Sequence, residues 1–221
     1  MIDADEFESQ RRSYRGDGWW RLLDGTRQSA HGRLRARTFS PTARQGVLQP
    51  TASADSATYI VRFYRAFSGR CIPTDLTLWN PPSLARQPSR TSELDTFVGE
   101  QDVIYVGGGD TANLLVLWRR HGLDVLLREA YSRGAVLAGV SAGMLCWFND
   151  GVTDSYGGLE PLRDGLGIIA ASACPHYDGE PERRPTYHRL IAAGMQPGYA
   201  ADDGAAFHFH GQALVEVVSS R

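Results

Sequence analysis

The chain has 221 residues, which suits one α/β domain with a buried sheet and leaves little room for a second domain. All 23 basic residues are arginine and nearly balance 25 Asp and Glu, and the net charge of −2 argues against nucleic acid or an anionic membrane as the main partner. No apolar run reaches the ~20 residues of a membrane helix, no signal peptide is visible, and three scattered cysteines exclude a disulfide framework, so we expect a soluble cytoplasmic protein.

The first 45 residues give little structural signal. Their one apolar island, residues 19–23, lies among Arg, Ser, Gly and Asp, and neither strand alternation nor a helical stripe extends from it. We therefore predict an atypical, poorly ordered segment over residues 1–45 and one folded domain over residues 46–221.

From Gly46 onward, short apolar runs alternate with helical patterns. Strands are expected at residues 47–48, 75–79, 103–106 and 135–140. Helices are expected at 55–67, around 94–98, from about 111, and through 126–132. Apolar strands that alternate with helices imply a parallel sheet covered on both faces. The predicted fold class is therefore α/β, a three-layer αβα sandwich with a mostly parallel central sheet.

The C-terminal third has a mixed pattern. It predicts a strand at 165–171 and a helix at 184–193. Short closing strands are expected at 199–200, 206–209 and 213–218, around turns that contain Asp and Gly.

Gly139-Val140-Ser141-Ala142-Gly143 is the strongest chemical signal. It lies where a predicted strand turns into a helix that we expect to extend through Trp147. A G-x-S-x-G sequence at such a junction is typical of a nucleophile elbow, because the glycines allow a sharp turn that exposes the serine hydroxyl. A glycine-flanked turn with a serine cap is the structural alternative.

Gly107-Gly108-Gly109-Asp110-Thr111 also joins a strand to a helix. In a parallel sheet, both glycine-containing loops lie at the carboxyl ends of their strands, where ligands bind. We therefore expect the amides of this loop to face the elbow.

Two weaker interpretations use nearby residues. Residues 107–112 fit a dinucleotide-binding G-x-G-x-x-A pattern, but the acidic residue with the right spacing, Glu129, falls inside a predicted helix. His208 and His210 lie on one face of a predicted strand and could bind a metal with Asp203, although no third firm ligand is evident.

A serine nucleophile needs a base and an acid that orients the base. His176 follows a predicted strand and is the best candidate base, whereas His188 lies within a predicted helix. Asp154, in a loop after the elbow, is the favoured acid, and it has three competitors: Asp178, Asp202 and Asp203.

Four segments, GGGDT, GVSAGM, VTDS and CPHYDGEPERR, resemble in order and spacing the serine aspartyl-dipeptidases of the peptidase E family, which are relatives of cyanophycinase with a class I glutamine amidotransferase-like fold. The resemblance extends from about residue 47 to the C-terminus. It implies cleavage of dipeptides with an N-terminal Asp through an acyl-enzyme, without a metal or other cofactor. It also implies that a homodimer can form.

Carried over to this chain, the resemblance makes Ser141 the nucleophile, His176 the general base and Asp154 the orienting acid. The amides of Gly109 and Ala142 then match the oxyanion hole. A related amidotransferase is disfavoured because the elbow carries serine where such enzymes carry cysteine.

An aspartyl substrate also needs a cationic partner. Arg183 and Arg184, with Arg189 close behind, follow His176 closely enough to supply it, and a guanidinium suits a carboxylate. Family members usually carry Asn where Asp110 stands, beside the substrate. The carboxylate of Asp110 would repel an aspartyl side chain or bind the free α-amine, so we expect altered Asp selectivity.

Both chain ends depart from the family pattern, which has an apolar strand near its start and a further strand at its end. The motifs and the resemblance together predict that residues 46–221 form a peptidase that acts on small peptides. The alternatives are a cyanophycinase-like or other amide hydrolase, or a truncated and catalytically impaired homologue.

Overall fold

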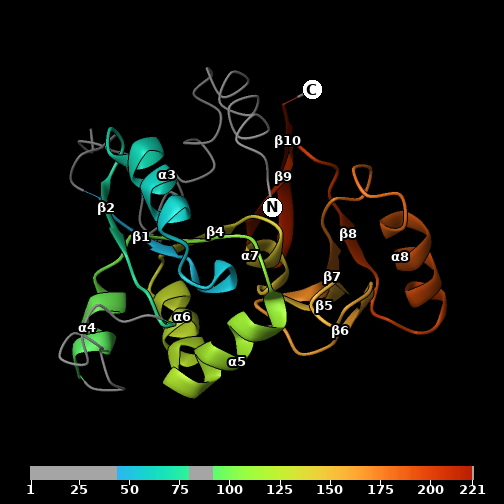
Figure 1. Cartoon of the computed structure of the whole chain (residues 1–221), viewed down its shortest axis with the longest axis horizontal. Coiled ribbons are helices and arrows are strands. Elements are labelled where there is room, and N and C mark those ends of the chain that lie inside the picture. The colour runs from blue at the N-terminus through green and yellow to red at the C-terminus, as the bar shows by residue number, and fades with distance from the viewer. Residues whose placement is uncertain (1–43, 80–91, 221) are drawn as a thin grey trace, which may run out of the picture.

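The computed structural model describes residues 44–79 and 92–220 (Figure 1). The predicted atypical segment over residues 1–45 therefore lies almost entirely outside the described residues. Within the described ranges, no helix is long and apolar enough to cross a membrane.

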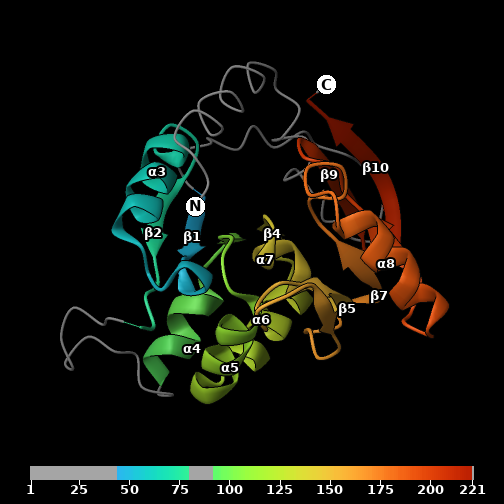
Figure 2. The same cartoon turned by 45° about the vertical axis from the view of Figure 1, so that its right-hand side comes forward.

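Four parallel strands form the first sheet, in the order β2-β1-β3-β4 (Figure 2). They are β1 (Gln45–Gln49), β2 (Ile72–Asp75), β3 (Val103–Val106) and β4 (Val136–Gly139). The short 3-10 helix η2 (Thr51–Ser53) follows β1.

Helices cover both faces of this sheet. Phe63 and Phe67 of α3 (Ala57–Phe67) contact the ring of Tyr105 in β3. The neighbouring β3 residues Ile104 and Val106 point to the other face, as the two-residue period of a strand requires, and belong to the main hydrophobic core. Three further helices contribute to that core: α4 (Ser92–Gly99), α5 (Thr111–His121) and α6 (Leu123–Ser132).

A second sheet has the order β6-β5-β7-β8, in which only the β5–β6 pair is antiparallel. Its strands are β5 (Phe148–Thr153), β6 (Glu160–Leu162), β7 (Ile169–Cys174) and β8 (Gly198–Ala200), and α8 (Arg183–Ala192) lies between β7 and β8 in the chain. The four-residue helix α7 (Ala142–Leu145) connects the two sheets.

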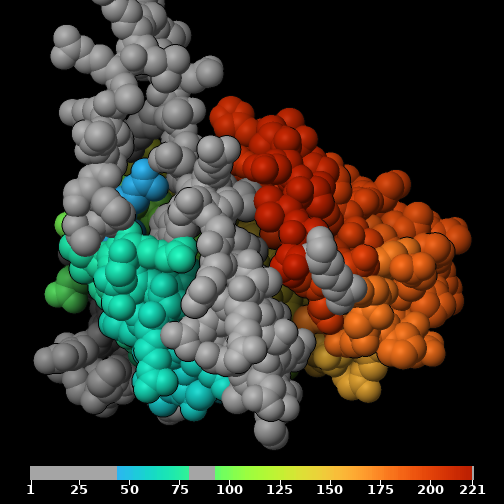
Figure 3. Space-filling view, turned by 90° about the horizontal axis from the view of Figure 1, so that it is seen from above, coloured from blue at the N-terminus to red at the C-terminus, as the bar shows by residue number. Residues whose placement is uncertain are grey.

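The chain closes with an antiparallel hairpin of β9 (Ala205–His210) and β10 (Ala213–Ser219). Phe209 of this hairpin packs against Phe148 and Tyr199 of the second sheet. Figure 3 shows the hairpin in red at the surface, beside the orange residues of the second sheet and α8.

The prediction of an α/β fold with mostly parallel strands between helices is confirmed, and the parallel strands divide into two sheets. The strand predicted at 75–79 lies at 72–75. The strand predicted at 165–171 begins only at Ile169, because Gly165 and Gly167 belong to a loop that packs closely on β5. The helix expected through Trp147 ends at Leu145. Strands β5 and β6 were not predicted, because β5 has the sequence FNDGVT, which contains no apolar run.

Candidate active site

Ser141 occupies the sharp turn between β4 and α7. Its backbone φ of 55° and ψ of −114° lie outside the regions that non-glycine residues normally adopt. The flanking glycines permit the turn: a Cβ on Gly139 would overlap the carbonyl group of Gly143, and one on Gly143 would overlap that of Val106. This strained serine between two obligatory glycines has the geometry of a nucleophile elbow, as predicted.

His176 lies against Ser141. Its Nε2 is 3.0 Å from the Ser141 Oγ, and its Nδ1 is 2.7 Å from a carboxylate oxygen of Asp203. Since a carboxylate only accepts hydrogen bonds, Nδ1 donates to Asp203, and Nε2 of the neutral ring accepts from the serine hydroxyl. His176 lies two residues after the end of β7, directly after Pro175. Like Ser141, it is a non-glycine residue with a positive φ, here 54°. The three side chains thus form a continuous hydrogen-bonded series of the kind found in serine hydrolases.

The predicted acid, Asp154, does not contact His176 in this arrangement. Its side chain is 66% exposed, and its carboxylate is 3.7 Å from Nη2 of Arg183. The choice of Asp154 does not fit this geometry: the carboxylate that contacts His176 is that of Asp203, which the sequence offered only as a competitor.

Strand order explains the position of Asp203. It follows β8, which pairs with β7 in the sheet, so the residues after both strands meet at one edge. Two hydrogen bonds from backbone amides fix this meeting: the amide of Tyr177 donates to the carbonyl of Ala201, and that of Asp203 donates to the carboxylate of Asp178. The signal available in the sequence was the Asp202-Asp203-Gly204 turn directly after a short strand.

The triple-glycine loop faces the elbow. A Cβ built on Gly108 would lie 3.3 Å from the Cβ of Ser141. Gly107 donates its amide hydrogen to Gln49, Gly108 to the hydroxyl of Tyr59, and Asp110 to the carbonyl of Ala52.

Two amides beside Ser141 are left without a partner. Within residues 44–79 and 92–220, neither the N–H of Gly109 nor that of Ala142 has a hydrogen-bond acceptor. Gly109 has a φ of +134°, and a side chain there would overlap Ala52, so only glycine suits the position. Among the described residues, the two amides predicted as oxyanion donors therefore have no acceptor, and their role stays a prediction.

Asp110 caps α5. Its carboxylate accepts from the backbone and side-chain amides of Asn113, at 2.8 and 2.9 Å. Ser155 supplements this cap by accepting from the amide of Thr111 at 2.9 Å. The Asp110 carboxylate therefore stays next to the glycine loop, half-buried, and only neutral groups donate to it in the described part of the chain.

The two predicted substrate-binding arginines differ sharply. Arg183 is 2% exposed and donates to Glu180 at 2.6 Å and to the carbonyl of Val152 at 2.9 Å. Its guanidinium thus holds the loop after His176 to β5. The prediction that Arg183 binds substrate does not fit this position, and the contacts indicate a structural role. Arg184 is exposed and lies over the ring of Tyr177, 4.6 Å from the ring centroid.

Neither buried cysteine near the site is suited to nucleophilic attack. Cys146 is completely buried, and burial raises the pKa of its thiol well above the ordinary value. Cys174 is also buried, which raises the pKa of its thiol to about 11. Both thiols therefore stay protonated at neutral pH, and Ser141 is the nucleophile that the geometry offers.

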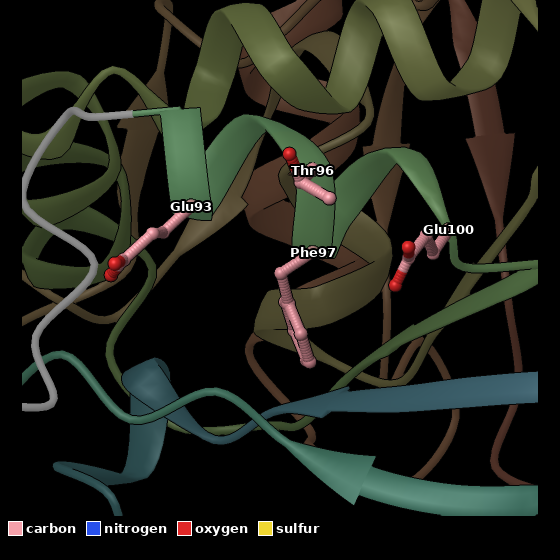
Figure 4. A pocket seen from close by; sticks show the side chains of 4 residues that line it. All are labelled: Glu93, Thr96, Phe97 and Glu100. Carbon is pink, nitrogen blue, oxygen red and sulfur yellow. The ribbon is translucent and has the colours of Figure 1, made fainter.

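The weaker sequence interpretations find no support in the described residues. Glu129 lies within α6, away from any strand end. Within residues 44–79 and 92–220, no group of three His, Cys, Asp or Glu could hold a metal, and His208 instead lies 3.9 Å from Glu216. A pocket on α4 is lined by Glu93, Thr96, Phe97 and Glu100 and contains no nucleophile–base pair (Figure 4).

Comparison with known proteins identifies the family of this chain. The model of peptidase family S51 matches residues 24–217. A peptidase of Bacillus subtilis strain 168, YgaJ, which is itself uncharacterized, is 56% identical over 174 residues, covering 78% of this chain and 72% of the relative. An uncharacterized Listeria monocytogenes peptidase, Lmo0363, is 29% identical over 136 residues, covering 58% of this chain and 65% of the relative.

Solved structures show the same fold. A Listeria monocytogenes EGD-e protein, provisionally assigned as a peptidase E, superposes with a TM-score of 0.61 at 24% identity, covering 81% of this chain and 88% of that one. The resemblance to peptidase E seen in the sequence is thereby confirmed. The match to the family model over most of its length shows that the chain belongs to peptidase family S51, a family of peptide-hydrolysing enzymes.

Proposed function

We propose that this peptidase is a serine-type enzyme that cleaves small peptides, chiefly dipeptides with an N-terminal Asp, through an acyl-enzyme. The observation that carries the proposal is the continuous hydrogen-bonded chain from the Ser141 hydroxyl through His176 to Asp203. Without these hydrogen bonds, a serine in a packed turn would have no base to remove its proton.

In the proposed mechanism, His176 takes the proton of Ser141 as the hydroxyl oxygen attacks the peptide carbonyl. Asp203 holds the imidazole in the tautomer that accepts this proton and stabilises the imidazolium that forms. The amides of Gly109 and Ala142 donate to the tetrahedral oxyanion, and each such donor is worth roughly 3–4 kcal/mol. His176 then gives the proton to the leaving amine, and water hydrolyses the acyl-enzyme by the same steps.

For the aspartyl preference, we propose Arg184 as the partner of the substrate carboxylate. Its guanidinium is exposed and stacks on Tyr177, the residue that follows the proposed base. A guanidinium can bind a carboxylate through two parallel hydrogen bonds. The buried Arg183 lacks this freedom because its donors are already engaged.

Hydrolysis of an Asp-p-nitroanilide tests the proposal. We expect release of p-nitroaniline by the wild-type protein, and a loss of at least about 10³-fold in kcat for Ser141→Ala, because removal of the nucleophile leaves only binding and oxyanion stabilisation. Cys146→Ala is the matched control. Cys146 caps the C-terminus of α7, the helix that begins after Ser141, and its thiol is buried. Activity that survives in Ser141→Ala would contradict the serine mechanism.

The Asp110→Asn substitution tests whether the carboxylate beside the glycine loop limits aspartyl selectivity. The variant keeps the helix cap, because Asn is as good an N-cap as Asp, and removes one negative charge. We expect the ratio of kcat/KM for Asp-p-nitroanilide over Ala-p-nitroanilide to rise on the order of five-fold, the effect of relieving about 1 kcal/mol of repulsion.

Asp124→Asn, at the first turn of α6, is the control for Asp110→Asn. An unchanged ratio for Asp110→Asn would refute the role of this charge in selectivity. A loss for every substrate with a free α-amine would instead assign the Asp110 carboxylate to that ammonium group.

A further inference from the structure

Tyr59 reaches from α3 to the glycine loop beside the proposed nucleophile. Its hydroxyl accepts a hydrogen bond from the Gly108 amide at 3.0 Å. Its ring lies flat against Gly107, where a Cβ would be 3.0 Å from the ring carbon Cε1. Burial raises the pKa of Tyr59, so the hydroxyl stays protonated at neutral pH.

This contact is unlike the other anchors of the loop. The amides of Gly107 and Asp110 are held by backbone carbonyls of Gln49 and Ala52, which no substitution removes. Gly108 is held by a side chain, and a Cβ built on it would lie 3.3 Å from the Cβ of Ser141. The Gly108 N–H belongs to the Gly107–Gly108 peptide, so Tyr59 anchors that peptide directly. The next peptide, which carries the Gly109 amide, lies between this anchor and the Asp110 amide held by Ala52.

Glycine makes that dependence strong. Without a Cβ, residues 107–109 meet few steric barriers to rotation about φ and ψ. If the Gly107–Gly108 peptide loses its anchor, rotation about φ and ψ of Gly108 can turn the following peptide, and this would rotate the Gly109 N–H away from the serine. Gly109 has a φ of +134°, which glycine adopts readily, so the contacts around it and not steric barriers must hold this conformation.

We propose that Tyr59 is a positioning residue for catalysis: its hydroxyl fixes the Gly107–Gly108 peptide and, through Gly108, holds the Gly109 amide in the orientation that faces the oxyanion. The inference rests on the proposed serine mechanism and assigns a role that neither the motif nor the family match contains. Tyr59 acts through the glycine loop and has no part in proton transfer.

The Tyr59→Phe variant removes the hydroxyl and keeps the ring. Tyr64→Phe is the matched control: it lies on the same helix, and its hydroxyl bonds to Asp75 at 2.9 Å, outside the site. Two readouts are compared, namely kcat and KM for Asp-p-nitroanilide, and the second-order rate of labelling of Ser141 by a fluorophosphonate.

For Tyr59→Phe we expect kcat and the labelling rate to fall about 10- to 100-fold with KM within two-fold of wild type, because loss of a full oxyanion donor costs 10²–10³-fold and here the donor is only misaligned. Tyr64→Phe should keep wild-type values of both. Amide hydrogen exchange at Gly108 should accelerate in Tyr59→Phe alone. Gly107→Ala places a Cβ against the ring of Tyr59 and should displace it, so this variant should show the same fall in kcat. It replaces Tyr59→Phe as the test if that variant does not fold.

Wild-type kinetics in Tyr59→Phe, or an equal loss in Tyr64→Phe, would overturn the role of Tyr59 and leave the serine mechanism intact. A wild-type protein whose Ser141 is neither labelled nor needed for hydrolysis would overturn both. The two failures are thus distinguishable by the behaviour of the wild-type protein and Ser141→Ala.

Discussion

Asp203→Asn is expected to lower kcat/KM for Asp-p-nitroanilide by about 10³-fold. An amide in place of the carboxylate can donate to Nδ1 and so favour the imidazole tautomer that cannot accept the serine proton, an effect worth up to about 10⁴-fold in a buried triad. The side chain of Asp203 is 32% exposed, so water can replace part of its effect. Steady-state kinetics of the folded variant measure the loss.

Asp154→Asn is the decisive companion to that experiment. Asp154 carries the same chemistry and was favoured by the sequence pattern, but its carboxylate faces Arg183 and solvent. We expect its kcat/KM to stay within about three-fold of wild type, the scale of an exposed ion pair. Loss of activity in Asp154→Asn with retention in Asp203→Asn would reverse the assignment of the acid.

Arg183→Met is expected to lower the free energy of unfolding by about 3 kcal/mol, because it removes the donor from a buried site and leaves its acceptors without a partner. The guanidinium is 2% exposed and joins Glu180 to the carbonyl of Val152. Methionine fills a similar volume, so the loss reports the polar contacts more than a cavity. Urea denaturation of wild type and variant measures the difference.

The control for this prediction is Arg184→Met, one residue further along α8. Arg184 is exposed, and its substitution should change stability by no more than about 0.5 kcal/mol. The same variant should raise KM for aspartyl substrates if Arg184 binds their carboxylate. An Arg183→Met protein as stable as wild type, with KM raised instead, would restore Arg183 as the substrate contact.

Local chain geometry was accessible from the sequence. The elbow around Ser141 and the glycine loop before Asp110 were predictable. Each needs glycine at particular positions for steric reasons, and the glycines at those positions can be recognised in the sequence. Strand β3 was predicted at its exact bounds because its four apolar residues lie between Asp102 and the triple glycine.

Spatial adjacency between distant segments was not accessible in the same way. Asp154 was favoured because it lies in a loop after the elbow and matches a family motif, whereas contact with His176 depends on β8 pairing with β7. Arg183 and Arg184 are neighbours in sequence, and only the face of α8 that packs on β5 separates the buried guanidinium from the exposed one. Tyr59 carries no motif at all.

The central claim is that Ser141 is an activated nucleophile. Intact-protein mass spectrometry after treatment with a fluorophosphonate tests it most directly, because an ordinary serine does not react with this reagent, whereas one with a paired base does. We predict one adduct per chain in the wild-type protein, located on the peptide that contains Ser141, and none in Ser141→Ala. A folded wild-type protein that takes up no label, or a Ser141→Ala protein that takes up as much, would contradict the account.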